Sequence, residues 1–346
     1  VYNYNAGIQR QLPQKLFLDV SYAGNLSRHL WLSQPLNTVP FGSAWQPYTQ
    51  DPTQTPAYNG TTNLPANLYR PYPGYGPITD FTWGTSANFN ALQVSLTRRV
   101  GRLQVGANYM WSKALGVGVG HPTNTRAFGY GPLTQDRAQS LSVNYIYDLP
   151  SPARPGSFLA NPAAKLILNN WELAGLTSIS TGAPVTPMYG VSGIGSTTLN
   201  QEITGSADVA PRVVLSCDPN LSRGSRGINE FINTSCFAPA QKGSIALDSG
   251  YNPVFGPGIN QWDMSLYKNI PVKERFRAQL RLEAYNAFNH TEWGTVNTTA
   301  LFNTAGQLIN LPTQLGGTGG RFGFGTENSI RANSQRILQV GAKVYF

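Results

Sequence analysis

The two cysteines of this 346-residue sequence, Cys217 and Cys236, are the residues whose type and spacing most clearly predict covalent chemistry. Both lie in one polar stretch, residues 182–261. In an oxidising compartment such a pair predicts a disulfide, which would stabilise the fold by roughly 3 kcal/mol by closing a loop of about 20 residues. Free thiols and a metal site are the alternatives, and a metal would require further ligands nearby.

Elsewhere the reactive side chains form no recognisable catalytic or metal-binding pattern. The sequence has no Gly-x-Ser-x-Gly, no His-Glu-x-x-His and no Walker loop. A lone Gly-x-Gly within residues 321–325 has no strand and helix around it, so we do not expect it to bind phosphate. The three histidines are far from the cysteines in the sequence: His29, His121 and His290. The sequence therefore predicts no enzymatic activity, no cofactor and no metal site.

Aromatic side chains gather in a second polar stretch, residues 24–90, among prolines and amides. Aromatic faces with amide groups around them suit sugars or hydrophobic chelates as ligands. The alternative for each aromatic residue is burial in a small core of the loop itself. The candidate ligand-capture residues are Trp31, Trp45, Tyr48, Tyr72, Tyr75 and Trp83.

The composition favours strands and polar loops over helices. Charged residues make up 12% of the chain, about half the usual share, while Gly (36) and Pro (25) are abundant. The mean hydropathy of −0.25 is compatible with a membrane barrel, because a barrel strand needs apolar residues only at every second position. No run approaches about 18 apolar residues, so a transmembrane helix is excluded. The net charge of +9 comes from scattered Lys and Arg, so we do not expect nucleic-acid binding.

Nine segments alternate apolar and polar residues with the period of two that predicts β-strands. They are residues 1–11, 16–23, 91–99, 103–111, 141–149, 171–181, 262–270, 276–288 and 336–346. Short turns and long polar segments alternate between them, apart from a Pro-rich connection of intermediate length at residues 150–170. The long segments are residues 24–90, 112–140, 182–261 and 289–335.

The spacing of these segments favours a transmembrane β-barrel. Strands of about 9–13 residues suit the ~9–11 that cross a bilayer at a tilt, and exceed the ~5–6 usual in soluble domains. Long loops are uncommon in compact soluble domains, whereas outer-membrane barrels combine short periplasmic turns with long extracellular loops. We therefore predict an all-β fold, an antiparallel transmembrane β-barrel with the four long segments outside the cell.

The alternation also assigns side chains to the two faces of the sheet. A charge on the lipid face costs about 2–4 kcal/mol near the bilayer midplane, so charged and polar residues belong on the lumenal face. The predicted lipid-facing residues are Leu92, Val94, Leu96, Val105, Ala107, Leu280 and Leu282. The predicted lumen-facing residues are Gln93, Ser95, Gln104, Asn108, Gln279, Arg281 and Glu283.

The strand count predicts that this chain is part of a larger barrel. The first and last strands of a closed antiparallel barrel are antiparallel neighbours, and bacterial barrels have even strand numbers. Here a short turn follows the first strand and a long loop precedes the last, so both run toward the periplasm. We therefore expect residues 1–346 to be the C-terminal part of one barrel domain, about its last nine strands, with two open sheet edges.

The last strand resembles the C-terminal signal of bacterial outer-membrane barrels. Its pattern is a polar residue (Gln339), a glycine two positions later (Gly341), a hydrophobic residue (Val344) and a final aromatic residue (Phe346). The resemblance implies that the barrel-assembly machinery reads this strand. The alternative is the last edge strand of a soluble sandwich.

Three segments resemble the C-terminal barrel of TonB-dependent outer-membrane receptors, above all the Oar-like type with a carboxypeptidase-regulatory-like domain. They are residues 90–99, 103–113 and 276–290, the last with an Asn-x-Phe-Asn run near its end. The resemblance covers essentially the whole chain. It implies a barrel of twenty-two strands, plugged by an N-terminal domain, that imports a scarce ligand with energy passed through TonB. We expect the plug and the TonB contact to lie upstream of this chain.

Three functions follow from these patterns. The first is TonB-energised uptake of a scarce ligand, a siderophore, an oligosaccharide or a peptide. The second is a non-transporting adhesin or surface-scaffold barrel in the outer membrane. The third is a soluble carbohydrate-binding β protein. The partners expected for the first are the outer-membrane lipid bilayer, the barrel-assembly machinery, TonB and a small-molecule or oligomeric ligand.

Overall fold

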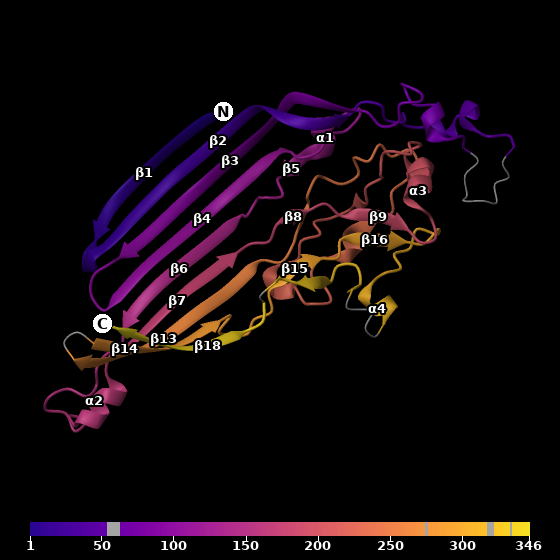
Figure 1. The fold of residues 1–346 in the computed structure, drawn as a ribbon. Coiled ribbons are helices and arrows are strands. Elements are labelled where there is room, and N and C mark those ends of the chain that lie inside the picture. Colours follow the sequence, from indigo (N-terminus) through magenta and orange to yellow (C-terminus); the bar gives the residue numbers. More distant parts are fainter. Residues whose placement is uncertain (54–62, 274–275, 317–321, 333) are drawn as a thin grey trace.

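The computed structural model describes residues 1–53, 63–273, 276–316, 322–332 and 334–346 of the chain. Its centre is one antiparallel sheet whose strands follow chain order, β1-β2-β3-β4-β6-β7-β13-β14-β18, with the short β5 beside β4 (Figure 1). These strands are β1 (Tyr2–Leu12), β2 (Leu16–Pro35), β3 (Thr79–Arg98), β4 (Leu103–Val117), β5 (Tyr130–Pro132), β6 (Gln139–Asp148), β7 (Trp171–Ser180), β13 (Ile259–Lys273), β14 (Phe276–Tyr285) and β18 (Ile337–Tyr345).

All nine predicted strands lie in this sheet, in the predicted order. Two of them are much longer than predicted, because β2 continues to Pro35 and β3 begins at Thr79. The connection between them is therefore residues 36–78 and not 24–90. The pairing register shifts around His29, whose φ of 53° is left-handed. Each shift places the residues that follow it on the opposite face of the sheet. A uniform alternation of polar and apolar residues therefore cannot continue past the shift.

Smaller differences concern the next two long connections. β4 continues to Val117 and pairs there with β5, so both ends of the predicted long segment 112–140 contain strand residues. β6 begins at Gln139, and β13 begins at Ile259. These extensions occur where a neighbouring strand forms backbone hydrogen bonds with the added residues. A local pattern of residue types does not show whether such a neighbour is present.

The register separates apolar from polar side chains, because cross-strand partners share a face. One row across five strands is apolar or aromatic: Val20, Val94, Tyr109, Leu141 and Ile179. The adjacent row on the opposite face is polar across six strands: Asp19, Ser95, Asn108, Ser142, Ser178 and Gln261. The predicted apolar and polar sets therefore lie on opposite faces of the sheet.

The two strands at the C-terminal edge show the same separation. Leu280 and Leu282 are 48% and 46% exposed on the apolar face. Arg281 lies on the other face, where its guanidinium donates to the Tyr345 hydroxyl (3.0 Å) and to Gln279 Oε1 (2.7 Å). The polar face thus carries a hydrogen-bonded network, whereas the apolar face offers side chains with no polar partner.

The connections differ in length between the two ends of the strands. One end has the turn η1 (Pro13–Lys15), residues 99–102 and the predicted β13–β14 turn, of which residues 274–275 lie outside the described part. The same end carries the helix α2 (Pro162–Leu168) between β6 and β7 (Figure 1). The long connections gather at the opposite end. This is the alternation of short and long connections that the sequence predicts.

The long connections fold into a packed body, named here the loop module, which comprises the described residues of 36–78, 118–138, 181–258 and 286–336. Its hydrophobic core is formed by the last two connections and includes Ile232, Phe302 and Phe324. Its elements are η2 (Ser43–Trp45), η3 (Pro47–Thr49), η4 (Ala66–Leu68), α1 (Thr125–Gly129), β8 (Pro184–Val185), β9 (Met188–Val191), α3 (Ser196–Ile203), β10 (Val214–Leu215), η5 (Arg223–Ser225), η6 (Thr234–Cys236), β11 (Phe237–Ala238), β12 (Val254–Phe255), β15 (Trp293–Val296), β16 (Thr299–Phe302), α4 (Pro312–Leu315) and β17 (Glu327–Ile330).

Pairing within the loop module joins segments that are distant in the chain. β9 pairs with β16 in parallel, and β8 pairs with β12. The helices in the described residues are short, and none is long and apolar enough to cross a membrane.

Leu282 lies between Leu266 and Val340 on the apolar face, so it tests whether that face contacts lipid. We predict that Leu282→Arg lowers the free energy of unfolding by about 2–4 kcal/mol, because a guanidinium near the bilayer midplane loses its hydration. Urea titration of the protein folded in lipid vesicles, read by heat-modifiable gel mobility, measures this change. Gln339→Arg, on the polar face opposite Glu283, is the control. An equal loss in both variants would contradict the assignment of faces.

Candidate functional site

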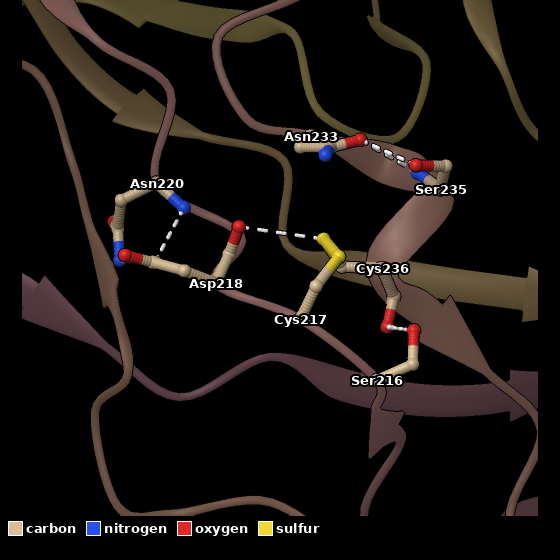
Figure 2. Close-up of a disulfide and its surroundings, with 7 residues drawn as sticks. All are labelled: Ser216, Cys217, Asp218, Asn220, Asn233, Ser235 and Cys236. Carbon is tan, nitrogen blue, oxygen red and sulfur yellow. Dashed lines mark hydrogen bonds between the residues drawn. A yellow bond between two sulfur atoms is a disulfide. The ribbon is translucent and has the colours of Figure 1, made fainter.

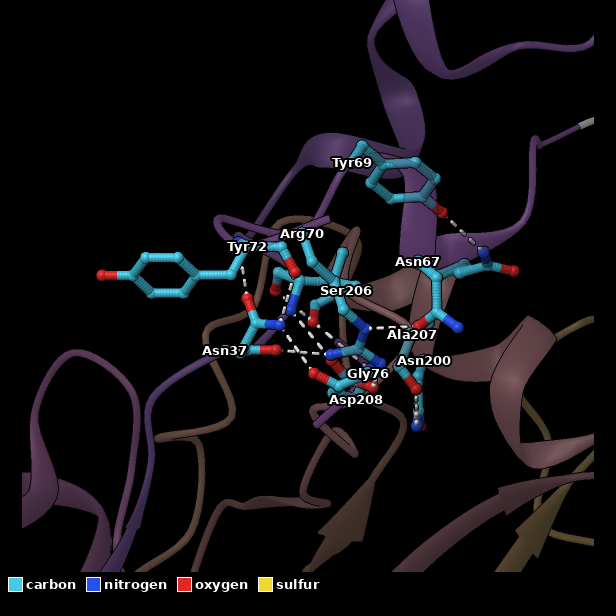
Figure 3. Close-up of polar contacts among 12 residues, drawn as sticks. Asn37, Asn67, Tyr69, Arg70, Tyr72, Gly76, Asn200, Ser206, Ala207 and Asp208 are labelled. Carbon is cyan, nitrogen blue, oxygen red and sulfur yellow. Dashed lines mark hydrogen bonds and ion pairs between the residues drawn. The ribbon is translucent and has the colours of Figure 1, made fainter. Parts of the chain in front are cut away.

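An ion pair between the buried Arg70 and the partly exposed Asp208 joins two of the long connections (Figure 3). The guanidinium binds the carboxylate as a fork, with N–O distances of 2.5 and 2.7 Å, and the Arg70 side chain is 5% exposed. Arg70 also donates to Asn67 Oδ1 (2.8 Å) and to the carbonyl of Asn37 (2.5 Å). Such a bidentate pair with further hydrogen bonds to two other residues holds two segments in one defined arrangement.

Hydrogen bonds around this pair fix the backbone of both connections. Asp208 Oδ2 accepts the backbone N–H of Val39 (2.8 Å), and the Ser206 hydroxyl donates to the Val39 carbonyl (2.6 Å). The Asn37 side chain accepts the N–H of Tyr72 (2.8 Å) and donates to the carbonyl of the same residue (2.9 Å). The 36–78 connection is thereby attached to the segment that follows α3.

Cys217 and Cys236 form a disulfide inside the loop module, with Cα atoms 5.0 Å apart (Figure 2). The Ser216 hydroxyl (3.1 Å) and backbone N–H (2.9 Å) both donate to the carbonyl of Cys236. Cys236 is fully buried and belongs to the hydrophobic core of the loop module. In the residues that the structure describes, no group of three or more His, Cys, Asp or Glu is placed to hold a metal ion.

His121 lies where three of the long connections meet and is 1% exposed. Its ring stacks on Phe41 (centroids 5.5 Å apart) and contacts the ring of Phe128 (4.6 Å). Nδ1 accepts the backbone N–H of Asn124 (3.1 Å). We therefore assign the proton of the neutral ring to Nε2, which donates it to the carbonyl of Ile245 (3.1 Å).

A buried cation lies beside this histidine. The Arg212 guanidinium lies over the Phe128 ring at 3.6 Å and donates to the carbonyls of Phe128 (2.7 Å) and Ser249 (3.1 Å). Burial lowers the pKa of Arg212 to about 10, so it is a cation at neutral pH. Burial also lowers the pKa of His121; the hydrogen bond to Ile245 opposes this effect, and the charge of Arg212 adds to it. The neutral form of His121 is therefore part of the folded structure.

An open groove of about 1130 Å³ lies on the loop module beside β15 and β17. A concave surface with apolar walls and a few polar groups is typical of ligand sites. We take this groove as the candidate ligand site. Its lining includes Ile228, Glu230, Trp293, Leu311, Phe322 and Glu327.

Glu327 gives the groove a carboxyl group whose pKa is raised. Burial raises its pKa to about 7, although the charges of His290 and Arg226 oppose the shift. Within the described part of the chain, no hydrogen bond or ion pair reaches its carboxyl oxygens. Near neutral pH this group can therefore accept a hydrogen bond from a ligand or, when protonated, donate one.

The six predicted ligand-capture aromatics are spread over the structure. Trp31 and Trp83 lie on β2 and β3, and Trp31 stacks on Phe81 with centroids 5.3 Å apart. The indole N–H of Trp45 donates to the carbonyl of Gln201 (3.0 Å), which attaches it to α3. None of the six lines the groove, and a shared capture site made by them stays a prediction. The three exposed loop members are Tyr48, Tyr72 and Tyr75.

The predicted assembly-signal residues lie along the C-terminal edge of the sheet. Gln339 pairs with Glu283 on the polar face, and Gly341 is in the same face of β18. Val344 is on the apolar face, and Phe346 follows the end of the strand, 96% exposed. Recognition of these residues by the assembly machinery stays a prediction.

Sequence reasoning did not single out Arg70, Asp208 or the groove, and it considered His121 only as a metal ligand. Arg70 and Asp208 are 138 positions apart, so no local pattern connects them. The sequence offered one indication, since only 12% of the residues are charged. A charged residue in a polar loop of such a chain can be expected to pair with an opposite charge.

The chain belongs to a family of outer-membrane proteins, because residues 1–339 match the family model described as "Outer membrane beta barrel domain". It is therefore an outer-membrane protein whose strands contact the lipid bilayer, a class that is typically not enzymatic. Membership of this family argues against the two soluble alternatives, which are the soluble sandwich and the soluble carbohydrate-binding protein.

A search of the curated proteins finds no match. Among solved structures, the outer membrane transporter YddB from Escherichia coli is similar, with 7% sequence identity and a TM-score of 0.40. The match covers 99% of this chain and 32% of that chain. This chain thus spans about a third of the length of that transporter.

Arg70→Ala removes the buried guanidinium that binds the Asp208 carboxylate, Asn67 and the carbonyl of Asn37. We expect a local loss of stability of about 2 kcal/mol in the loop module, from the lost charged hydrogen bonds, measured as faster backbone hydrogen exchange around Val39 and Ser206. The double variant Arg70→Met/Asp208→Leu removes both charges at similar volume and should recover most of the loss. Unchanged exchange in Arg70→Ala would show that the pair does not hold these connections together.

We predict that the loop module loses stability as the pH falls below about 6.5, the ordinary pKa of histidine. The folded-state pKa of His121 is the lower one, so below that pH the unfolded state binds a proton first and unfolding is favoured. Hydrogen exchange around Asn124 at about pH 7.5 and about pH 5.5 measures the effect. His121→Gln keeps a donor and an acceptor without titrating, and its exchange should depend less on pH. The same pH dependence in both proteins would argue against His121 as the cause.

Proposed function

We propose that this chain forms part of the barrel wall of a TonB-dependent outer-membrane receptor of the Oar-like type, which takes up a scarce ligand. The observation that carries the proposal is the loop module: the long connections are folded into a packed body with an open groove of about 1130 Å³. A preorganised concave surface costs little ordering when a ligand binds, which is what capture of a dilute ligand requires.

In the proposed orientation the loop module lies outside the cell and the short turns lie in the periplasm. Short periplasmic turns and long extracellular loops are the rule for bacterial outer-membrane barrels. The disulfide between Cys217 and Cys236 agrees with this side, because disulfides persist in oxidising compartments. The groove is then open to ligands in the medium.

The chemistry of the groove favours a ligand with an apolar or aromatic body and several hydrogen-bonding groups. Trp293 and Phe322 offer aromatic surface, while Glu230 and Glu327 offer carboxyl groups on the same groove. Siderophores, oligosaccharides and peptides all fit this description. In this proposal the ligand is held outside the cell, on the loop module.

The polar face supplies the lining of a lumen through which the ligand passes. Arg281, Glu283 and Tyr345 are examples of the charged and hydrogen-bonding groups on this face. In the proposed receptor the nine long strands are part of a wall of twenty-two, and other parts of the protein supply the plug and the contact with TonB. The strand β18, with Phe346 after it, serves as the signal for the barrel-assembly machinery.

The test uses cells that produce the intact protein and three labelled probes: a ferric hydroxamate siderophore, a fluorescent malto-oligosaccharide and a fluorescent peptide. We predict that one probe accumulates in the periplasm and that a protonophore or loss of TonB abolishes accumulation. Trp293→Ala should weaken binding of that probe about tenfold, because it removes a central aromatic contact. Leu68→Ala, exposed in another connection, is the matched control.

An adhesin or scaffold barrel gives a different result in the same experiment. Its surface binds a probe or a neighbouring cell without accumulation and without dependence on TonB. Binding of this kind, or accumulation that continues after the protonophore is added, would overturn the proposed uptake function.

A further inference from the structure

The connection between β6 and β7, residues 149–170, differs from the other connections at its end of the sheet because it carries the helix α2 (Figure 1). Asn161 caps this helix by accepting the N–H of Ala164 (2.7 Å), and Pro162 occupies its first turn. The Asn169 side chain closes the base of the connection by hydrogen bonds to both backbone groups of Ala153 (3.1 and 2.9 Å). The connection is therefore an organised element and not an open loop.

The C-terminal end of α2 is attached to the apolar face of the sheet. Lys268 of β13 pairs with Trp171 on one side and Leu280 on the other, which places it on the face that contacts lipid. Its ammonium donates to the carbonyls of Ile167 (3.2 Å) and Asn169. The connection covers Lys268 so well that this residue is only 6% exposed.

Trp171 strengthens the same attachment. Its indole N–H donates to the carbonyl of Ile167 (2.7 Å), and the Lys268 ammonium lies 5.2 Å from the ring centroid. The free carbonyls at the end of a helix carry partial negative charge, so they stabilise a cation in the absence of a carboxylate. Tryptophan and lysine with this division of apolar stem and polar tip are typical of the boundary between lipid and water.

Beyond this attachment, the connection exposes large apolar side chains. Phe158 is 94% exposed, Leu166 55% and Ile167 62%. Residues 149–170 also contain Arg154 and Lys165 but no Asp or Glu. Exposed apolar groups accompanied only by basic charges suit the surface of a bilayer with anionic headgroups.

We infer that residues 149–170 form an interfacial membrane element, with Phe158, Leu166 and Ile167 in the phospholipid leaflet at the short-turn end of the barrel. The site is continuous with the lipid-facing wall through Lys268 and Trp171, so lipid is the medium that reaches it first. The positive charge of the connection complements anionic phospholipid. This inference rests on the outer-membrane location of the sheet and is independent of the proposed uptake function.

The experiment places nitroxide spin labels on the intact protein reconstituted in vesicles of phosphatidylethanolamine and phosphatidylglycerol. The label is attached to Phe158→Cys or Ile167→Cys without reductant, so that the native disulfide remains closed. We expect collisions with dissolved oxygen to exceed collisions with a water-soluble nickel chelate at both positions. Tyr75→Cys, 79% exposed in a long connection, is the matched control and should show the opposite preference.

A second variant separates the attachment from the lipid contact. Lys268→Met in the Ile167→Cys protein removes the cation that holds the end of α2, so we expect a more mobile label and a smaller preference for oxygen. Heat-modifiable gel mobility checks that each variant is folded as a barrel. A preference for the nickel chelate at both 158 and 167 in folded protein would overturn the inference. An unchanged label at 167 in Lys268→Met would overturn the attachment of α2 through Lys268.

Discussion

The backbone of a chain in hydrocarbon has no water to bind, and this constraint governs the whole structure. Every N–H and C=O within the bilayer needs a partner, and the long sheet supplies one for each strand that has two neighbours. The strands follow chain order, so each new strand satisfies the edge left by the one before it. In the described residues β1 and β18 each have a single neighbour, and the sheet does not close on itself.

In the proposed orientation the loop module lies in water, where lipid cannot cover its apolar groups. Its connections therefore bury side chains such as Phe302 and Phe324 against one another. The disulfide then closes a loop within one connection, and the Arg70–Asp208 pair and His121 join different connections to one another. Such joints favour a single arrangement of the loops, and a groove can keep its shape only in a single arrangement.

Lys268 is an exception to the two-sided pattern of the sheet, since it is a cation on the apolar face. The exception is understandable in the folded protein, where the end of α2 covers the ammonium and accepts its hydrogen bonds. Such local departures from a pattern are often the places where an additional contact or function is found. Here the departure connects the wall of the barrel with the element between β6 and β7.

The sequence by itself determined the nine strands, their order and the two faces of the sheet. This was possible because each strand carries its signal locally, as a period of two in side-chain polarity. The bounds of β2 and β3 were wrong, because the predicted strands ended at residue 23 and began at residue 91, whereas the pairing continues through the register shifts near His29. Only the tertiary structure decided which loops meet, because Arg70 and Asp208 are distant in sequence and His121 gathers its neighbours from three connections. Contacts of that kind depend on how the strands place the ends of the loops in space, and no local pattern of residues encodes that placement.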